Sequence, residues 1–397
     1  MFLNNFILQS LGTARGDDIW HHMMATELAE QMTLGNWSFV ASYFTSGNRA
    51  FHLWVGFLYF LTGIGKSGAE GLNAMFGIWG ALALTRHLAN SLPQSTRVPD
   101  SMLLVTLLPS AIFWTSILLK ESLLFWAMCI FFTSTLPSQQ GNNFRLSIMA
   151  LISLMVGIPL RPYTMIAWTV SITVVTFYRS RRVVLSAIMA VGLIFSANFF
   201  GGQIETKGKG EMVGGATELL GFAEKYSESA RKWQVEGDST IGGPQIFLVS
   251  GAISLFFRPF LWNVRAVRLV LTSAEIWTIS LLIIFGWAQA SPTDRRLLWG
   301  RPDVSVSLLV CMAFSVLFTY LPNEGIIARS RLQAMPALLT LAYMPLLQRH
   351  SRRVERQRMR ASYAQQAQYQ QLTGNAMQRN DAAMSTRVNP AARDLTK

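Results

Sequence analysis

Two adjacent carboxylates and two adjacent imidazoles lie near the start of the chain, within Arg15–His22. A carboxylate at a membrane surface can accept a proton from a hydroxyl group, so Asp17 and Asp18 are candidate catalytic bases. The pair could also hold a divalent cation such as magnesium or manganese, although two adjacent acids do not by themselves define a metal site, and we assign no metal ligands. The alternative is structural, because acids are common in the first turn of a surface helix.

The neighbouring histidines have no accompanying motif for metal or nucleotide binding. We therefore interpret His21 and His22 as interfacial hydrogen-bonding residues with an accessory part in any chemistry. A second charged site is the pair Lys120-Glu121, which splits a long apolar run. Lys120 could bind a phosphate as a point charge, with Glu121 as an accessory residue. The alternative is a hairpin turn whose charges lie among lipid headgroups.

Arginines form the third group of candidates. Arg161 and Arg258 each precede a proline at the end of an apolar run, and Arg329 and Arg331 precede the last apolar segment. Arginine suits phosphate because its planar fork of donors binds two oxygens at once. These arginines therefore predict an anion-binding rim, unless each one only reaches out to headgroup phosphates.

The composition indicates what kind of body must position these residues. The chain is 51% hydrophobic and 14% charged, whereas soluble domains carry about 25% charged residues. The net charge of +13 falls largely in short clusters beside apolar segments, which is the pattern of cytoplasmic loops in membrane proteins. No basic stripe with interleaved aromatic residues is present, so we do not expect nucleic-acid binding. Cys129 and Cys311 lie inside apolar segments and indicate neither a disulfide nor a metal site.

The apolar segments predict an all-α, polytopic transmembrane bundle of about nine to eleven helices. We expect an N-terminal part, 1–50, with interfacial helices, then a membrane domain, 51–347. Its larger extracytoplasmic loop, 201–268, would include a short interfacial helix at 244–257. The tail, 348–397, is basic and Gln-rich, and we expect it to be cytoplasmic and disordered beyond an initial helical continuation. The apolar segments lie at about 51–64, 71–90, 102–119, 121–136, 146–160, 163–178, 183–200, 244–257, 269–289, 304–321 and 331–347.

Orientation follows from the basic clusters. With the Arg349–Arg360 cluster in the cytoplasm, Arg161 and Lys120 fall on the outer face. Counting 51–64 as a full span would, however, place the aspartates inside. Either that segment is not a simple span, or one helix in 71–136 is broken, with Pro109 as a candidate break.

Taken in order, these clusters resemble one family of membrane enzymes. The matching elements are Gly16-Asp17-Asp18, PSAIFWTSILLKES, LRPY, FRPFLW and NEGIIARSRLQAMP. They are similar to membrane-embedded glycosyltransferases of the C-type superfamily that use polyprenyl-phosphate sugars, in particular the protein mannosyltransferase-like branch and its bacterial relatives in polysaccharide biosynthesis. That family has a complete transmembrane helix before its acidic motif, whereas only residues 1–15 precede the motif here.

The resemblance implies roles for the candidate residues. An acid in the first extracytoplasmic loop, Asp17 or Asp18, would act on the hydroxyl acceptor, which is a glycan, a lipid or a protein. Basic residues near the outer face would bind the lipid phosphate of the donor. We therefore expect a multi-pass protein of the bacterial inner membrane that transfers a sugar from a polyprenyl-phosphate donor. By motif context the basic residues are Lys120, Arg161, Arg258, Arg329 and Arg331.

Three other functions stay open at this point. A lipid-linked oligosaccharide polymerase or ligase would depend on the large loop and not on the aspartates. A transporter or flippase predicts paired charges near the bilayer midplane and related halves, and we see no internal repeat. A non-catalytic scaffold predicts no pocket joining the charged clusters.

Overall fold

The computed structural model describes residues 15–91, 109–136, 143–180, 247–262, 267–319 and 324–387. All regular structure in these ranges is helical, which confirms the predicted all-α class for this part of the chain. The predicted segment 183–200 and most of the predicted outer loop lie outside the described residues. The helices are α2 (Arg15–Thr33), α3 (Trp37–Ala41), α4 (Asn48–Thr62), α5 (Lys66–Asn90), α6 (Pro109–Thr115), α7 (Glu121–Thr135), α8 (Asn143–Leu160), α9 (Pro162–Ser180), α12 (Phe247–Phe257), α13 (Val267–Ala288), α14 (Pro292–Trp299), α15 (Pro302–Thr319), α16 (Glu324–Arg331) and α17 (Met335–Arg387).

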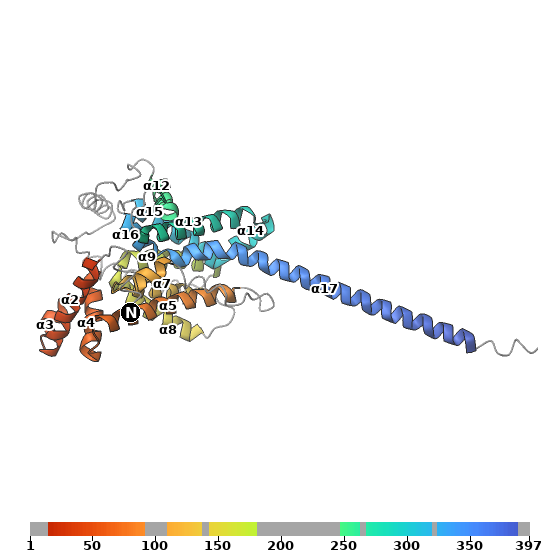
Figure 1. The fold of residues 1–397 in the computed structure, drawn as a ribbon, viewed down its shortest axis with the longest axis horizontal. Helices are drawn as coiled ribbons and strands as arrows, with labels where there is room; N and C mark the ends of the chain where they lie inside the picture. Colours follow the sequence, from red (N-terminus) through yellow and green to blue (C-terminus); the bar gives the residue numbers. More distant parts are fainter. Residues whose placement is uncertain are drawn as a thin grey trace, which may run out of the picture.

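The N-terminal helices form one end of the molecule, where α2 packs along α4 (Figure 1). Ala25 and Leu28 of α2 and Phe51 of α4 are fully buried. Gly56 permits the close approach, because a Cβ atom there would lie 2.8 Å from the Leu28 Cβ. The helices expected between residues 17 and 50 are therefore present, and α2 is fixed against the body of the protein.

The apolar run around Lys120 is not one continuous helix, as the predicted split at Lys120-Glu121 indicated. The break lies between the end of α6 at Thr115 and the start of α7 at Glu121, while Pro109, the candidate break, begins α6. Asn73 of α5 stabilises the break, because its side-chain amide donates to the carbonyl oxygens of Ile117 (2.8 Å) and Leu119 (2.7 Å). Lys120 and Glu121 therefore lie at a fixed turn inside the protein.

The second half of the bundle is built on α12, α13, α15 and α17. Helix α12 packs chiefly against α15 and also contacts α13, and Ser254 and Leu255 on it are buried. The sequence predicted a short interfacial helix at 244–257. The structure gives that helix but places it inside the bundle, because its apolar side chains find partners on α15.

Fewer helices than predicted meet the length and apolarity of a membrane span. Among the described residues, Leu269–Ala288 of α13 is long and apolar enough, and the bent pair of α14 with Pro302–Phe318 of α15 raises the number to two at most. The expected nine to eleven spans are not reached by this measure, since other apolar helices such as Glu121–Thr135 are shorter.

The C-terminal tail differs from the expectation of disorder. Helix α17 begins in the core and continues without interruption to Arg387, so that its last part projects from the body (Figure 1). Between Pro345 and Gly374 the segment contains neither proline nor glycine and is rich in Arg, Gln and Ala. These residues have high helix propensity, which explains why a polar segment continues the helix.

Candidate functional site

The main polar feature of the interior is an ionic cluster around Glu121, the first residue of α7. Its Oε1 accepts from Nη2 of Arg161 (2.8 Å) and from Nε of Arg329 (2.6 Å). The Glu121 side chain is 0% exposed, and those of Arg161 and Arg329 are 11% and 19% exposed. The other oxygen, Oε2, is buried and has no hydrogen-bond partner among the described residues.

Lys120 adds a third cation to this site. Its Nζ donates to Oδ1 of Asn48 at the start of α4 (2.7 Å). Arg161 is further oriented by Oγ of Ser330, which accepts from Nη1 at 3.4 Å. We call Lys120, Glu121, Arg161 and Arg329 the Glu121 cluster. It brings three cations and one carboxylate together in a largely buried setting, a combination that can bind an anion.

Helix α2 faces the Glu121 cluster through His21. Burial and the neighbouring His52 lower the pKa of His21 to about 3. Glu121 acts in the opposite sense, while Lys120 and Arg329 lower the pKa further. The two imidazoles share a hydrogen bond of 2.7 Å between Nδ1 of His21 and Nε2 of His52. His21 is therefore neutral at pH 7 and lies within electrostatic range of the cluster.

Asp18 lies one turn before His21 and His22 on α2. Its Oδ2 accepts from Nζ of Lys66 at 2.6 Å, and Lys66 also lies 3.7 Å from Glu70. The Oδ1 atom of Asp18 is buried and has no hydrogen-bond partner in the part of the chain that is described. One oxygen of Asp18 is thus paired with a cation, whereas, among the described residues, the other is not. The side chain of Asp17 lies outside the described residues.

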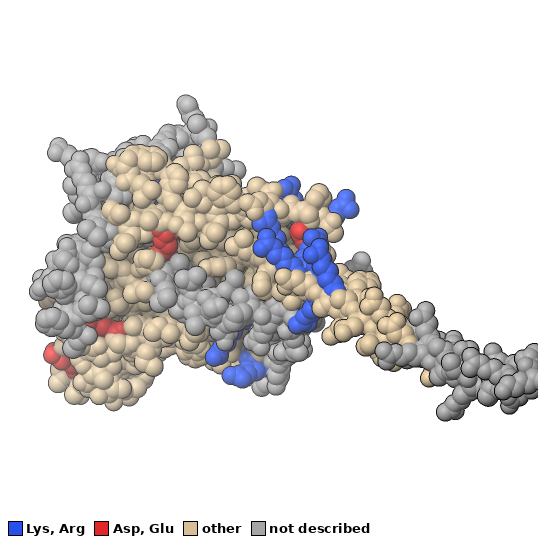
Figure 2. Space-filling model, turned by 45° about the vertical axis from the view of Figure 1, so that its right-hand side comes forward, with Lys and Arg blue, Asp and Glu red and all other residues tan. Residues whose placement is uncertain are grey.

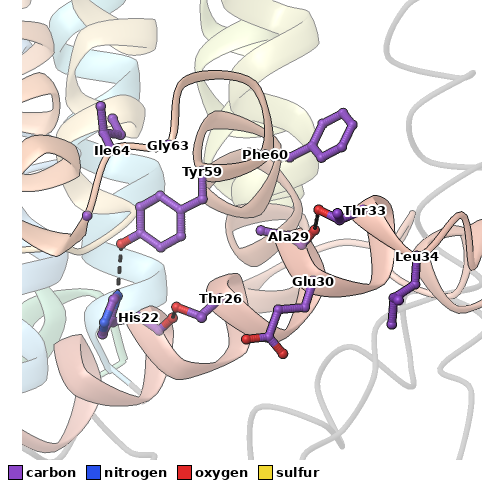
Figure 3. A pocket seen from close by; sticks show the side chains of 11 residues that line it. His22, Thr26, Ala29, Glu30, Thr33, Leu34, Tyr59, Phe60, Gly63 and Ile64 are labelled. Carbon is purple, nitrogen blue, oxygen red and sulfur yellow. Dashed lines mark hydrogen bonds between the residues drawn. The ribbon is translucent and has the colours of Figure 1, made fainter.

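A hollow of about 660 Å³ opens between α2 and α4, and its lining on α2 starts at His22, one turn after Asp18. In Figure 3 the Tyr59 hydroxyl points at His22, and the two groups share a hydrogen bond of 3.0 Å. Thr26 and Glu30 of α2 line the same hollow, which ends at Gly65, next to Lys66. Burial and Lys66 lower the pKa of His22, and Asp18 opposes them. The lining combines hydroxyl, carboxylate and aromatic groups, which are groups that bind polyhydroxyl compounds.

The predicted rim of arginines is divided in two by the structure. Arg258 and Arg331 are only 2% and 1% exposed and lie together between α12 and α16. Arg331 donates to the carbonyl oxygens of Ser254 (3.0 Å) and Arg258. Glu275 lies close enough to act on the charge of Arg331. Arg329 and Arg331 thus belong to different polar groups although only one residue separates them on α16.

Several residues that build the site were not selected from the sequence. Asn48 and Ser330 orient the cations of the Glu121 cluster, Lys66 pairs with Asp18, and Asn73 fixes the turn. Asn73 carried a usable signal, because an amide inside an apolar segment needs partners. Asn48 and Ser330 lie in polar stretches and gave none.

Among the described residues, no group of three or more His, Cys, Asp or Glu side chains is placed to hold a metal ion. A divalent cation at Asp17 and Asp18 stays a prediction. Comparison of the chain with models of protein families, with curated proteins and with solved structures found no match. The functional argument therefore depends on the geometry and on the resemblance in sequence.

Proposed function

We propose that the protein is a membrane-embedded glycosyltransferase, which moves a sugar from a polyprenyl-phosphate donor to a hydroxyl acceptor on the extracytoplasmic face. One observation carries the proposal. Lys120, Arg161 and Arg329 come from distant parts of the sequence and lie together around the buried carboxylate of Glu121. A largely buried group of cations of this kind suits the phosphate of a lipid-linked donor.

The proposed reaction assigns two separate roles to the two polar groups near α2. The Oδ1 atom of Asp18 takes the proton from the acceptor hydroxyl, as its lack of another partner supports. The acceptor oxygen then forms a bond to the anomeric carbon, while the bond from that carbon to the phosphate oxygen breaks. The polyprenyl phosphate leaves with the electron pair, and the cations of the Glu121 cluster stabilise its growing negative charge. The configuration at the anomeric carbon is inverted.

The hollow between α2 and α4 supplies room for the acceptor in this proposal. Its lining extends to Gly65, the residue before Lys66, and its polar groups include His22, Tyr59 and Glu30. These groups can hydrogen-bond to sugar hydroxyls, and the exposed ring of Phe60 at the rim offers an aromatic surface. The acceptor class that fits is a carbohydrate or another compound with several hydroxyl groups.

Transfer can be tested with the full chain in lipid nanodiscs. Decaprenyl phosphates that carry mannose, glucose or galactose serve as donors and alkyl glycosides as acceptors, and the released decaprenyl phosphate is measured. We expect one donor to be consumed, with a loss of about 100-fold or more in Asp18→Asn and Arg329→Gln. Arg352→Gln, which alters an arginine of an ion pair elsewhere, is the matched control and keeps full activity.

Two outcomes would contradict the proposal. The first is that the natural protein consumes none of the donors with any acceptor offered. The second is that Asp17→Ala and Asp18→Ala both retain full activity at equal expression, which would favour a polymerase, a ligase or a transporter. Translocation of intact donor lipid without sugar release would indicate a flippase.

A further inference from the structure

A concentration of arginine lies where α17 leaves the body of the protein. Helix α14, which follows α13, is joined to α17 by Arg352 and Asp294 (2.7 Å). Arg349 of α17 also donates to Oε1 of Gln289, just beyond the end of α13 (2.5 Å). We call residues 291–303 and 349–356 the basic collar. It is one continuous surface built from two distant segments.

The basic collar carries strong positive charge. It contains seven arginines and three carboxylates, and two of the carboxylates pair with Arg352 and Arg301 within the collar. Figure 2 shows Lys and Arg gathered over this part of the surface. The exposed arginines include Arg295, Arg296, Arg353 and Arg356.

Helix α14 has the character of a helix that lies in a membrane interface. It meets α15 at an angle of 79° and follows directly on the apolar helix Leu269–Ala288. Leu297 and Trp299 on it are 51% and 48% exposed, beside Arg295 and Arg296. Exposed Trp and Leu next to arginines are typical of segments at the level of the headgroups.

From this arrangement we infer that the basic collar binds the headgroups of anionic phospholipids. The collar begins where the apolar length of α13 ends, so its charges lie at the depth of lipid phosphates if α13 spans a bilayer. Arginines near such a surface are attracted to anionic lipids, and the exposed Leu297 and Trp299 fit the adjoining acyl region. This inference depends on the membrane embedding in the proposed function and not on sugar transfer.

The collar also gives the molecule an orientation. Basic residues beside spans remain on the cytoplasmic side, so the collar marks the cytoplasmic end of α13. Helix α16, which carries Arg329, lies toward the opposite end of α13 in Figure 1. The Glu121 cluster would then lie toward the outer leaflet, as the sequence predicted for its cations.

Lipid binding can be measured on the full chain in neutral detergent micelles. The protein is titrated with palmitoyl-oleoyl phosphatidylglycerol or phosphatidylcholine, and bound lipid is counted by native mass spectrometry. We expect phosphatidylglycerol to bind more tightly, and its binding to weaken about 5-fold for each arginine removed in Arg353→Gln and Arg356→Gln. The preference should also fall steeply in 0.5 M salt, because a short Debye length screens exposed charges.

The matched control removes the same charge from the same helix farther from the body. The double variant of Arg379→Gln and Arg387→Gln alters positions about 30 Å or more beyond the collar along α17. It should bind phosphatidylglycerol as the natural protein does. Equal binding of the two lipids, or equal weakening in the collar and control variants, would overturn the inference. Tighter binding of a single-stranded oligonucleotide than of phosphatidylglycerol would also overturn it.

Discussion

The Glu121 cluster and the basic collar are two regions of the protein that use arginine in opposite ways. In the Glu121 cluster, Arg161 and Arg329 share one oxygen of a carboxylate that is 0% exposed. In the basic collar, arginines such as Arg353 are exposed to solvent. Buried charges require partners held in a fixed geometry. Exposed charges act through an electrostatic field that salt can screen. The same side chain is therefore suited to holding one ligand in the first region and to contacting a charged surface in the second.

The largest expected difference between the Glu121 cluster and the basic collar is the loss of stability when one partner of an ion pair is removed. Glu121→Gln leaves Arg161 and Arg329 buried without their carboxylate, and we expect a loss of about 3–5 kcal/mol in stability. Arg352→Gln removes one side of an ion pair in the collar and should cost less than about 1 kcal/mol. Thermal unfolding of both variants in detergent measures the difference. Equal shifts in melting temperature would show that the two regions do not differ as described.

A smaller loss is expected from the turn that supports the Glu121 cluster. Asn73→Ala removes the donor to the carbonyl oxygens of Ile117 and Leu119. Leaving such groups buried and unpaired costs about 1–3 kcal/mol. Chemical unfolding in detergent gives the value, and Gln365→Ala on the exposed part of α17 serves as control. An unchanged stability in Asn73→Ala would mean that the turn needs no support from α5.

Acid should weaken the N-terminal end through His21. The folded protein holds the pKa of His21 at about 3 by burial, whereas an unfolded histidine has a pKa of about 6.5. The unfolded state thus gains the proton first as the pH falls from about 6.5 to about 3. Stability from this group is complete above pH 6.5 and declines by at most about 1.4 kcal/mol per pH unit below it. His21→Gln should flatten the pH dependence of the melting temperature, and an unaltered slope would contradict this assignment.

The smallest expected difference is the response of the two ion-paired regions, the Glu121 cluster and the basic collar, to salt. Raising the salt concentration to 1 M shortens the Debye length to about 3 Å. The contribution of the pair formed by Arg352 and Asp294 should fall by a few tenths of a kcal/mol. The pair formed by Glu121 and Arg161 should change less, because it is shielded from solvent. Double-mutant cycles at low and high salt measure both contributions, and a greater salt response of the Glu121 pair would reverse the comparison.

The sequence predicted most of the described helices, because long apolar runs are typical of buried or membrane-embedded helices. The split at Lys120-Glu121 was also predicted, because the two charges interrupt an apolar run. The pairing of Arg161 and Arg329 with Glu121 was not predicted, and their part in anion binding stays a prediction. The sequence did not predict that Arg329 and Arg331 belong to different polar groups. That division depends on the orientation of α16 about its axis, between α7 and α12. The continuous helix beyond Pro345 was missed because low apolarity was given more weight than helix propensity.

The predicted number of membrane spans is not confirmed by the described residues. Apolar runs such as 121–136 were counted as spans, yet the helix there ends at Thr135 and packs on α5 and α8. Length and apolarity alone do not distinguish a short span from a buried core helix. The partner of Asp18, Lys66, was not predicted either, because it begins α5, 48 residues away along the chain.

The central claim is that the Glu121 cluster holds the phosphate of a polyprenyl lipid. It is tested most directly by binding decaprenyl phosphate to the full chain in nanodiscs, with decaprenol as the uncharged comparison. The account predicts a clear preference for decaprenyl phosphate that falls about 10-fold or more in Arg329→Gln, recovers in part in Arg329→Lys and is unchanged in Arg379→Gln, which lies on the projecting part of α17 outside the basic collar. Equal binding of the alcohol and the phosphate, or a preference that survives Arg329→Gln intact, would contradict it.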